Sequence, residues 1–285
     1  MRTFTARLTA AAATLAIAAG PALAQDDDTI VVEALRDADR GEVNEQTRAI
    51  TPRATSVGQP LARFQRPICV GVYGMSGDSA ALIADRIYYN AEAMGLSVDA
   101  TPGCTANVIA AFVADPQAEF ATLRARYSGL VEGLSYWEKK AVWTTDGPVL
   151  AWNVISTRTA GGQERSGNPP VFDDTQISRL NTGIRRDMEL SIVMIDTDAL
   201  VSVDGVAVAD YVTMRALAKT RVPKADDANF ATILTLFDNP GDAPARLTDF
   251  DRAYIGSLYA SRENLPANMA FADMTQLMVE GRQER

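Results

Sequence analysis

The sequence predicts an α+β fold. Its N-terminal part is a mixed sheet with helices, and its C-terminal half is helical. Short apolar or β-branched runs alternate with segments of helical spacing as far as Ile195, and only helical patterns follow from Gly205 onward. The chain has 285 residues and is 47% hydrophobic, a composition typical of globular proteins. Residues 61–285 are long enough for one sizeable core, so we expect a single α+β domain there.

The first half of this domain is expected to alternate strands with helices. A buried strand is predicted at residues 68–73, and a helix follows at 79–94 because its apolar residues recur at helical spacing before Gly95. Further strands are predicted at residues 107–113, 149–157 and 190–195, and further helices at 120–127 and 136–143.

The second half is expected to be helical. Helices are predicted at residues 205–220, 228–237, 248–261 and 268–281. Thr248 and Asp251 have the spacing of a capping box, which marks the start of the third of these helices.

The first 24 residues have the features of a signal peptide. Arg2 and Arg7 flank the start of an apolar run, and Ala22-Leu23-Ala24 has the small-x-small pattern of a cleavage site before Gln25. We therefore expect a periplasmic or secreted protein, and no later segment is apolar for long enough to span a membrane. Residues 25–60 are polar and poor in aromatic residues, which predicts a flexible N-terminal arm with a helix at residues 41–50.

Charge and composition disfavour several classes of function. The formal net charge is −9, and an acidic surface repels the phosphates of nucleic acids. The chain contains no histidine, so it has no Ser-His-Asp triad and no His-ligated zinc. We predict no cofactor and no metal.

The two cysteines predict one disulfide. An even number of cysteines in an exported chain favours a bond between Cys69 and Cys104. Two free buried thiols and a two-cysteine metal site are the alternatives.

A turn between the first predicted strand and helix contains a serine. In Gly74-Met75-Ser76-Gly77-Asp78-Ser79, Ser76 stands where a nucleophile elbow would place it. The segment departs from G-x-S-x-G at Asp78 and has no P-loop lysine, so we interpret it as a turn in which Asp78 or Ser79 caps the helix.

Acidic residues recur in the second half of the chain. Two of them facing each other across a cleft could perform glycosidase chemistry without histidine, and the alternative is that they are solvated loop residues. These residues are Asp173, Asp174, Asp196, Asp198, Asp204, Asp226 and Asp227.

One predicted helix carries a family resemblance. The string Val208-Ala209-Asp210-Tyr211-Val212-Thr213-Met214-Arg215-Ala216-Leu217-Ala218 follows a strand, as the metal-binding helix does in zincin metalloproteases. With residues 231–237 and 247–266, it resembles the C-terminal part of a secreted bacterial zincin-like family of unknown function. From Leu61 onward, the chain resembles an uncharacterised exported alphaproteobacterial protein family.

The zincin resemblance implies a scaffold without its metal centre. Asp210, Tyr211 and Met214 stand where H-E-x-x-H would have its first ligand, its general base and its second ligand. These residue types cannot hold a zinc ion or act as the base at neutral pH. The alternative is that Tyr211 and Met214 belong to a helix face that packs in the core.

The N-terminal arm contains a second motif. Asp28-Thr29-Ile30-Val31-Val32-Glu33-Ala34 resembles the TonB box of outer-membrane transporters, an extended peptide that adds a strand to the TonB periplasmic domain. The resemblance implies that Asp28, Thr29, Ile30, Val31 and Val32 contact a TonB-like periplasmic partner. No transporter barrel follows, so the alternative is a strand that packs on its own domain.

These observations favour a soluble periplasmic binding protein of the cell envelope, non-enzymatic, with a protein or peptide partner. A carboxylate-dependent hydrolase of envelope glycans is one alternative. A TonB-interacting accessory protein is the other.

Overall fold

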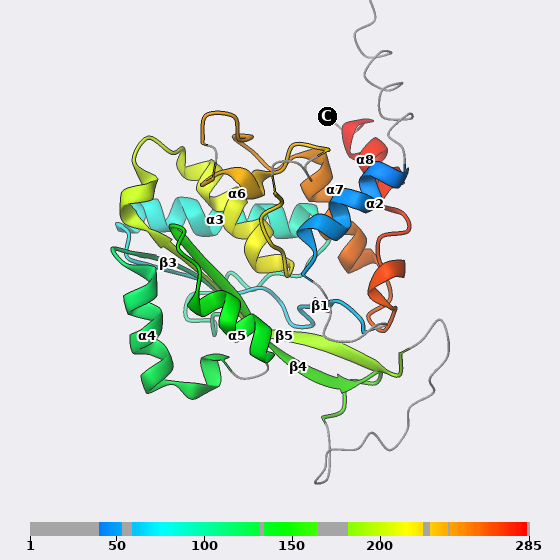
Figure 1. The fold of residues 1–285 in the computed structure, drawn as a ribbon, viewed down its shortest axis with the longest axis horizontal. Helices are drawn as coiled ribbons and strands as arrows, with labels where there is room; N and C mark the ends of the chain where they lie inside the picture. The colour runs from blue at the N-terminus through cyan, green and yellow to red at the C-terminus, as the bar shows by residue number, and fades with distance from the viewer. Residues whose placement is uncertain are drawn as a thin grey trace, which may run out of the picture.

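The computed structural model describes residues 40–52, 59–131, 134–164, 182–224, 229–238 and 240–283. These residues form a five-stranded sheet and seven α-helices. Figure 1 shows how these elements are arranged. The prediction of an α+β fold with a mixed sheet and a helical C-terminal half is confirmed. In the described part of the chain, no helix is both long and apolar enough to cross a membrane.

The sheet has a parallel centre and one antiparallel edge. β2 (Val70–Tyr73), β3 (Val108–Val113) and β5 (Ile184–Asp196) run parallel in that spatial order, and the short β1 (Ala62–Arg63) pairs in parallel with the start of β5. β4 (Val149–Thr159) pairs antiparallel with β5 over nearly its whole length. Among the described residues, the other edge of β4 pairs with no strand.

Helices cover both faces of this sheet (Figure 1). On one face, α3 (Gly77–Ala93) and α6 (Gly205–Leu217) pack against the apolar residues of β3 and β5, in the core that also includes α7 (Asp249–Ala260). On the other face, α4 (Pro116–Arg126) and α5 (Tyr136–Trp143) pack against Leu150 and Trp152 of β4. The central strands are buried by both layers, which explains their apolar sequences.

The helix α2 (Arg40–Ile50) is part of the core. Val43 and Ile50 are buried with Met274 of α8 (Met274–Gln283), and the Gln46 side chain donates a 2.8 Å hydrogen bond to the Phe230 carbonyl oxygen. The helix predicted at residues 41–50 is confirmed. Its inclusion in a flexible arm is wrong for residues 40–52, because these few apolar side chains suffice to bury one helix face.

The turn after β2 requires glycine and is capped differently than predicted. Gly74 has a φ of +83°, and a Cβ atom there would lie 1.9 Å from the Phe112 carbonyl oxygen. α3 begins at Gly77 with Ser76 as its N-cap, and the Ser76 side chain makes no capping hydrogen bond. The prediction that Asp78 or Ser79 caps this helix is therefore wrong.

The helix predicted at residues 228–237 is also wrong. Within the described part of that range, only the short 3₁₀ helix η4 (Ile233–Thr235) forms. The buried carboxylate of Asp251 accepts hydrogen bonds from the Thr232 hydroxyl at 2.6 Å and the Ile233 N–H at 2.9 Å. These bonds hold the segment against the start of α7, where the Thr248 and Asp251 capping box is confirmed.

The segment predicted as a helix at residues 268–281 forms two elements. A 3₁₀ helix, η5 (Ala267–Met269), comes first, and α8 begins only at Met274.

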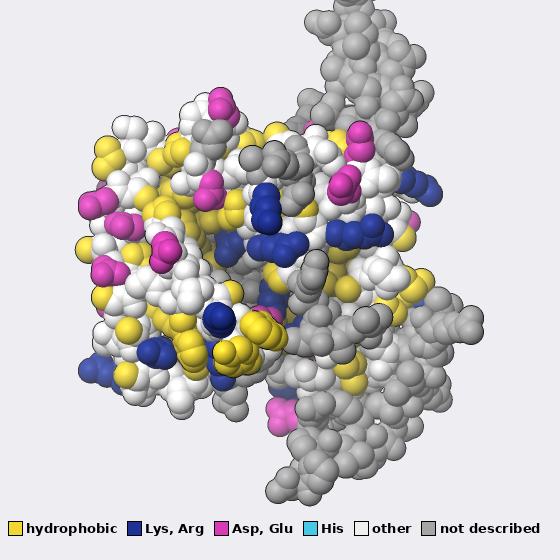
Figure 2. Space-filling view, viewed as in Figure 1, with side chains coloured by type: hydrophobic (Ala, Val, Ile, Leu, Met, Phe, Trp, Pro, Cys, Tyr) yellow, Lys and Arg dark blue, Asp and Glu magenta, His cyan; other side chains and the backbone are white. Residues whose placement is uncertain are grey.

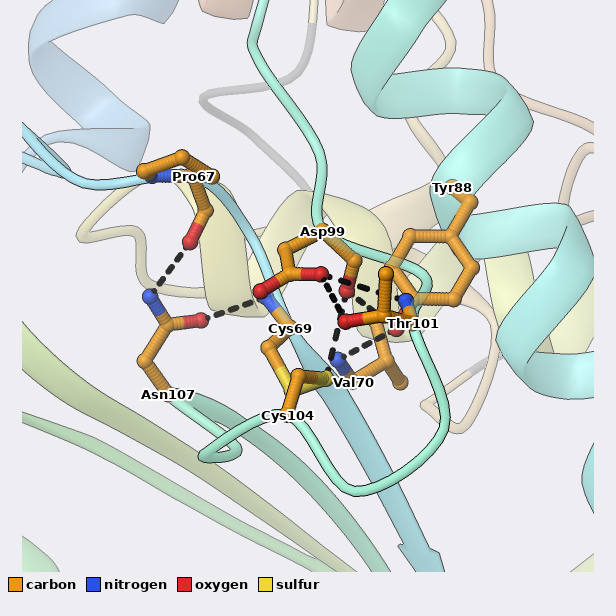
Figure 3. Close-up of a disulfide and its surroundings, with 8 residues drawn as sticks. All are labelled: Pro67, Cys69, Val70, Tyr88, Asp99, Thr101, Cys104 and Asn107. Carbon is orange, nitrogen blue, oxygen red and sulfur yellow. Dashed lines mark hydrogen bonds between the residues drawn. A yellow bond between two sulfur atoms is a disulfide. The ribbon is translucent and has the colours of Figure 1, made fainter.

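Cys69 and Cys104 are joined by a disulfide, with their Cα atoms 6.2 Å apart (Figure 3). The bond ties the start of β2 to the loop before β3. Beside it, the buried side chain of Asn107 accepts a hydrogen bond from Cys69 N–H and donates one to the Pro67 carbonyl oxygen, both at 2.9 Å. The disulfide and the amide together fix where β2 enters the sheet.

Candidate functional site: a cleft along the edge of β4

A cleft of about 970 Å³ opens at the free edge of β4. Residues 148, 149 and 151–153 form its floor, α5 and the two residues before it form one wall, and the end of α6 with residues 219–222 forms the other. Phe237 and Asp238 also line it. Figure 2 looks onto a face with a hollow near its centre, around which Lys and Arg side chains gather.

The floor of the cleft offers main-chain hydrogen-bonding groups. The N–H of Asp196 bonds to the Pro148 carbonyl oxygen at 2.8 Å. Because hydrogen-bonded and non-hydrogen-bonded pairs alternate in an antiparallel ladder, the N–H and C=O groups of Val149, Ala151 and Asn153 point away from β5. All three residues line the cleft. The spacing of these groups suits the addition of another extended strand.

One wall of the cleft is rich in cations. Arg215 of α6 and Lys219 just beyond that helix both line it, as does Arg221. The Arg215 guanidinium donates a 3.0 Å hydrogen bond to the Thr220 carbonyl oxygen, while its buried Nε atom has no hydrogen-bond partner among the described residues. An unpartnered buried donor is unfavourable, so this wall can gain free energy from an acceptor on a ligand.

Lys219 forms an ion pair with Glu138 of α5 across the cleft. The second carboxylate oxygen of Glu138 accepts a 2.7 Å hydrogen bond from Ser135 N–H, so both oxygens are engaged. Burial lowers the pKa of Lys219 to about 8. The ammonium group is thus held in a partly desolvated position where an additional anion would stabilise it.

The rest of the lining is largely apolar and aromatic. The rings of Tyr211 and Phe237 meet edge to face with centroids 4.9 Å apart, and burial raises the pKa of the Tyr211 hydroxyl. Trp152 lies at the floor and the exposed Trp137 at the mouth. The cleft therefore offers apolar surface beside cationic side chains.

The three positions singled out by the zincin resemblance do not form a site together. Asp210 is fully buried, and its carboxylate accepts hydrogen bonds from Arg86, Asn90 and the Leu247 N–H at 2.6 to 3.0 Å. Met214 is fully buried in the core. Tyr211 alone of the three lines the cleft. In the chain as described, no group of three or more Cys, Asp or Glu side chains could hold a metal ion.

Comparison of the chain with protein-family models, curated proteins and solved structures finds no match. The family resemblances noted in the sequence therefore stay predictions.

The other sequence candidates lie away from the cleft or outside the described residues. The Ser76 hydroxyl donates a 3.1 Å hydrogen bond to the Ser79 hydroxyl, and Asp204 forms an ion pair with Arg246. Asp196 caps a 3₁₀ helix by accepting the Asp198 N–H. The predicted signal peptide and the acidic residues at 173, 174, 226 and 227 lie outside the described residues, as do the TonB-box residues Asp28, Thr29, Ile30, Val31 and Val32.

Sequence reasoning missed the residues that shape the cleft. Lys219, one of four lysines in the chain, belongs to no recognisable motif. Glu138 was interpreted only as part of a predicted helix. The available signal was the pair of cations at 215 and 219, close to the end of an otherwise apolar helix. A cation there is commonly explained by the helix dipole, so the signal alone does not indicate a ligand.

Proposed function

We propose that the protein is an exported, non-enzymatic binding protein of the cell envelope that holds an extended segment of a peptide or protein in the β4 cleft. The observation that carries the proposal is the cleft along the edge of β4 that pairs with no strand in the described part of the chain. Three residues at its floor have main-chain N–H and C=O groups that face outward. A bound segment adds a strand to β4 through main-chain hydrogen bonds, and its side chains contact the apolar lining.

The charges of the cleft favour a segment that carries a carboxylate. Arg215, Lys219 and Arg221 outnumber Glu138 and Asp238 in the lining, although the whole chain has a net charge of −9. A carboxylate from the ligand would accept from the Arg215 or Lys219 side chain in a partly desolvated place, where such bonds are strong.

A zincin-like scaffold that lacks its metal centre remains part of the proposal. The buried bonds of Asp210 and the core position of Met214 support a packing role for the residues at the metal-ligand positions. The two other candidate functions have less support. Both oxygens of Glu138 are engaged, which disfavours it as a glycan-hydrolysing carboxylate, and the TonB-box resemblance rests on residues outside the described part.

Binding of labelled peptides, followed by fluorescence anisotropy, tests the proposal. The probe is a hexapeptide of alternating valine and threonine that ends in aspartate, and the comparison peptide ends in lysine with an amidated C-terminus. We expect the aspartate peptide to bind more tightly, and Lys219→Gln to weaken its binding about tenfold. The matched control is Lys224→Gln, because Lys224 is exposed and does not line the cleft.

The pH dependence of the same binding follows from the Lys219 pKa. Because the ammonium loses its proton as the pH rises through about 8, we expect the affinity for the aspartate peptide to fall between pH 7 and pH 9. The lysine peptide should show no such fall.

Methylation of the peptide amides tests the main-chain hydrogen bonds. Only alternate N–H groups of a bound strand point toward β4, so methylation of those amides should abolish binding, and methylation of the intervening amides should leave it intact. Equal binding of all these peptides would contradict the proposal.

A further inference from the structure

The outer face of α5 carries exposed aromatic and basic residues. Tyr136 and Trp137 are 68% and 69% exposed, and Trp143 is 45% exposed. The Lys140 ammonium lies 5.9 Å from the centroid of the Trp137 ring, and the Arg124 guanidinium of α4 lies 5.0 Å from the centroid of the Trp143 ring. These five residues are called the α5 surface below.

Packing within the domain does not explain this arrangement. The inner side of α5 is already used, because Val142 is buried in the core and Glu138 pairs with Lys219. Tyr136, Lys140 and Trp143 are spaced i, i+4, i+7, so they share the opposite side of the helix. Large aromatic side chains gain free energy when they leave water. Tyr136 and Trp143 lie on this side of α5 and Trp137 lies next to it, and a short helix that exposes three aromatic side chains is typical of an interaction surface.

The charges of the α5 surface are basic in an otherwise acidic protein. Arg124 and Lys140 form no ion pair with any described residue. Figure 2 shows dark blue and yellow side chains together over α4 and α5, in the lower part of the view, while most of the magenta side chains lie higher. The Debye length is about 8 Å at physiological ionic strength, so distant carboxylates are largely screened from a ligand at this surface.

We propose that the α5 surface docks the protein on a lipid bilayer that contains anionic headgroups. Trp and Tyr rings are favoured at the headgroup level, where one part of the ring system is apolar and another is hydrated. Cations beside such rings add attraction to acidic lipids. The proposal is independent of peptide binding, although Trp137 also lines the mouth of the cleft, so docking would bring that mouth to the membrane surface.

Co-sedimentation with lipid vesicles tests the proposal on the full mature chain. We expect binding to vesicles of phosphatidylcholine mixed with phosphatidylglycerol, weaker binding to phosphatidylcholine alone, and a decrease with added salt. The tryptophan emission should shift to shorter wavelength on binding, because two of the three tryptophans lie on the α5 surface. The double variant Trp137→Ala, Trp143→Ala should lose about tenfold or more in partitioning.

Two further variants test whether vesicle binding depends on the α5 surface or is nonspecific adsorption of the protein. Arg124→Glu with Lys140→Glu should remove the preference for phosphatidylglycerol. Tyr89→Ala should bind as the unchanged protein does, since Tyr89 is 61% exposed beside Arg86 on α3, which covers the sheet face opposite α5. Urea unfolding of each variant checks that it is folded. The proposal is overturned if the unchanged protein binds neither vesicle type, or if the tryptophan variant binds vesicles as well as the unchanged protein does. It is also overturned if sedimentation velocity shows that the α5 surface joins two copies of the chain.

Discussion

At the scale of single residues, partners decide the role of a buried charge. Asp210 stands at a position that a family resemblance would assign to a metal ligand, yet its two carboxylate oxygens accept four hydrogen bonds. Three come from Arg86 and Asn90 of α3, and the fourth comes from the Leu247 N–H. This network joins α3, α6 and the segment before α7. Asp210 therefore fixes how three parts of the chain pack together.

Loss of the Arg86 partner should destabilise the fold. Arg86→Met leaves the fully buried Asp210 carboxylate without its cation, and we expect the free energy of unfolding to fall by about 3 kcal/mol in a urea titration. The matched control is Arg66→Met, which breaks the ion pair of the exposed Arg66 with Glu189 and should cost less than about 1 kcal/mol. Equal effects of the two variants would contradict the structural role of the Asp210 network.

At the scale of elements, local sequence patterns predicted the helices and strands whose ends are determined by local interactions. The strands at β2, β3 and β4 and the helices at α3, α5, α6 and α7 were predicted close to their observed bounds, because apolar periodicity and capping residues are local signals. The helix expected at residues 228–237 failed because its alternative is stabilised by Asp251, a residue outside the pattern.

The cleft could not be predicted for a related reason. Its walls come from α5 and α6, which lie far apart in the sequence, and its floor depends on which residues of β4 face away from β5. That register is a property of the paired strands. β4 was predicted as a strand, but nothing in its own sequence indicated that one of its edges would pair with no other described strand.

The turn that links β2 to α3 should tolerate no side chain at one of its glycines. In Gly74→Ala, the new Cβ meets the Phe112 carbonyl oxygen and the backbone keeps a positive φ, so we expect a loss of about 3 kcal/mol in unfolding free energy. Gly77→Ala is the control, since no described atom beyond its chain neighbours and the backbone of its own helix lies within 4 Å of its Cβ position at the start of α3. That variant should unfold within about 1 kcal/mol of the unchanged protein. A harmless Gly74→Ala would refute this account of the turn.

At the scale of the whole molecule, one disulfide secures the entry of the chain into the sheet. Cys69 and Cys104 are 35 residues apart in sequence, and the link holds the β2 end of the parallel sheet to the loop before β3. The rest of the sheet is held by hydrogen-bonded pairing and by helices on both faces. The disulfide therefore supports the part of the sheet that is farthest from β4 and the cleft.

Removal of the disulfide should lower the free energy of unfolding without changing peptide binding in the cleft. For the double variant Cys69→Ala, Cys104→Ala we expect a loss of about 3 to 4 kcal/mol, because the unfolded chain regains the entropy of the closed loop. Urea unfolding measures the loss, and peptide binding by the folded variant should be unchanged. Labelling of the unchanged protein after unfolding without reductant should detect no free thiol, and two labelled thiols per chain would argue against the bond.

The contact between α2 and α8 has a consequence for how the chain matures. Val43 and Ile50 are buried in a core that also includes Met274 and Met278, so an early part of the domain is completed by a late one. A nascent chain that leaves the ribosome or a translocation pore from its N-terminus must keep the apolar side of α2 uncovered until almost everything else has followed. The apolar side of α2 can therefore be covered only after α8 has been made, so this part of the core forms late in folding.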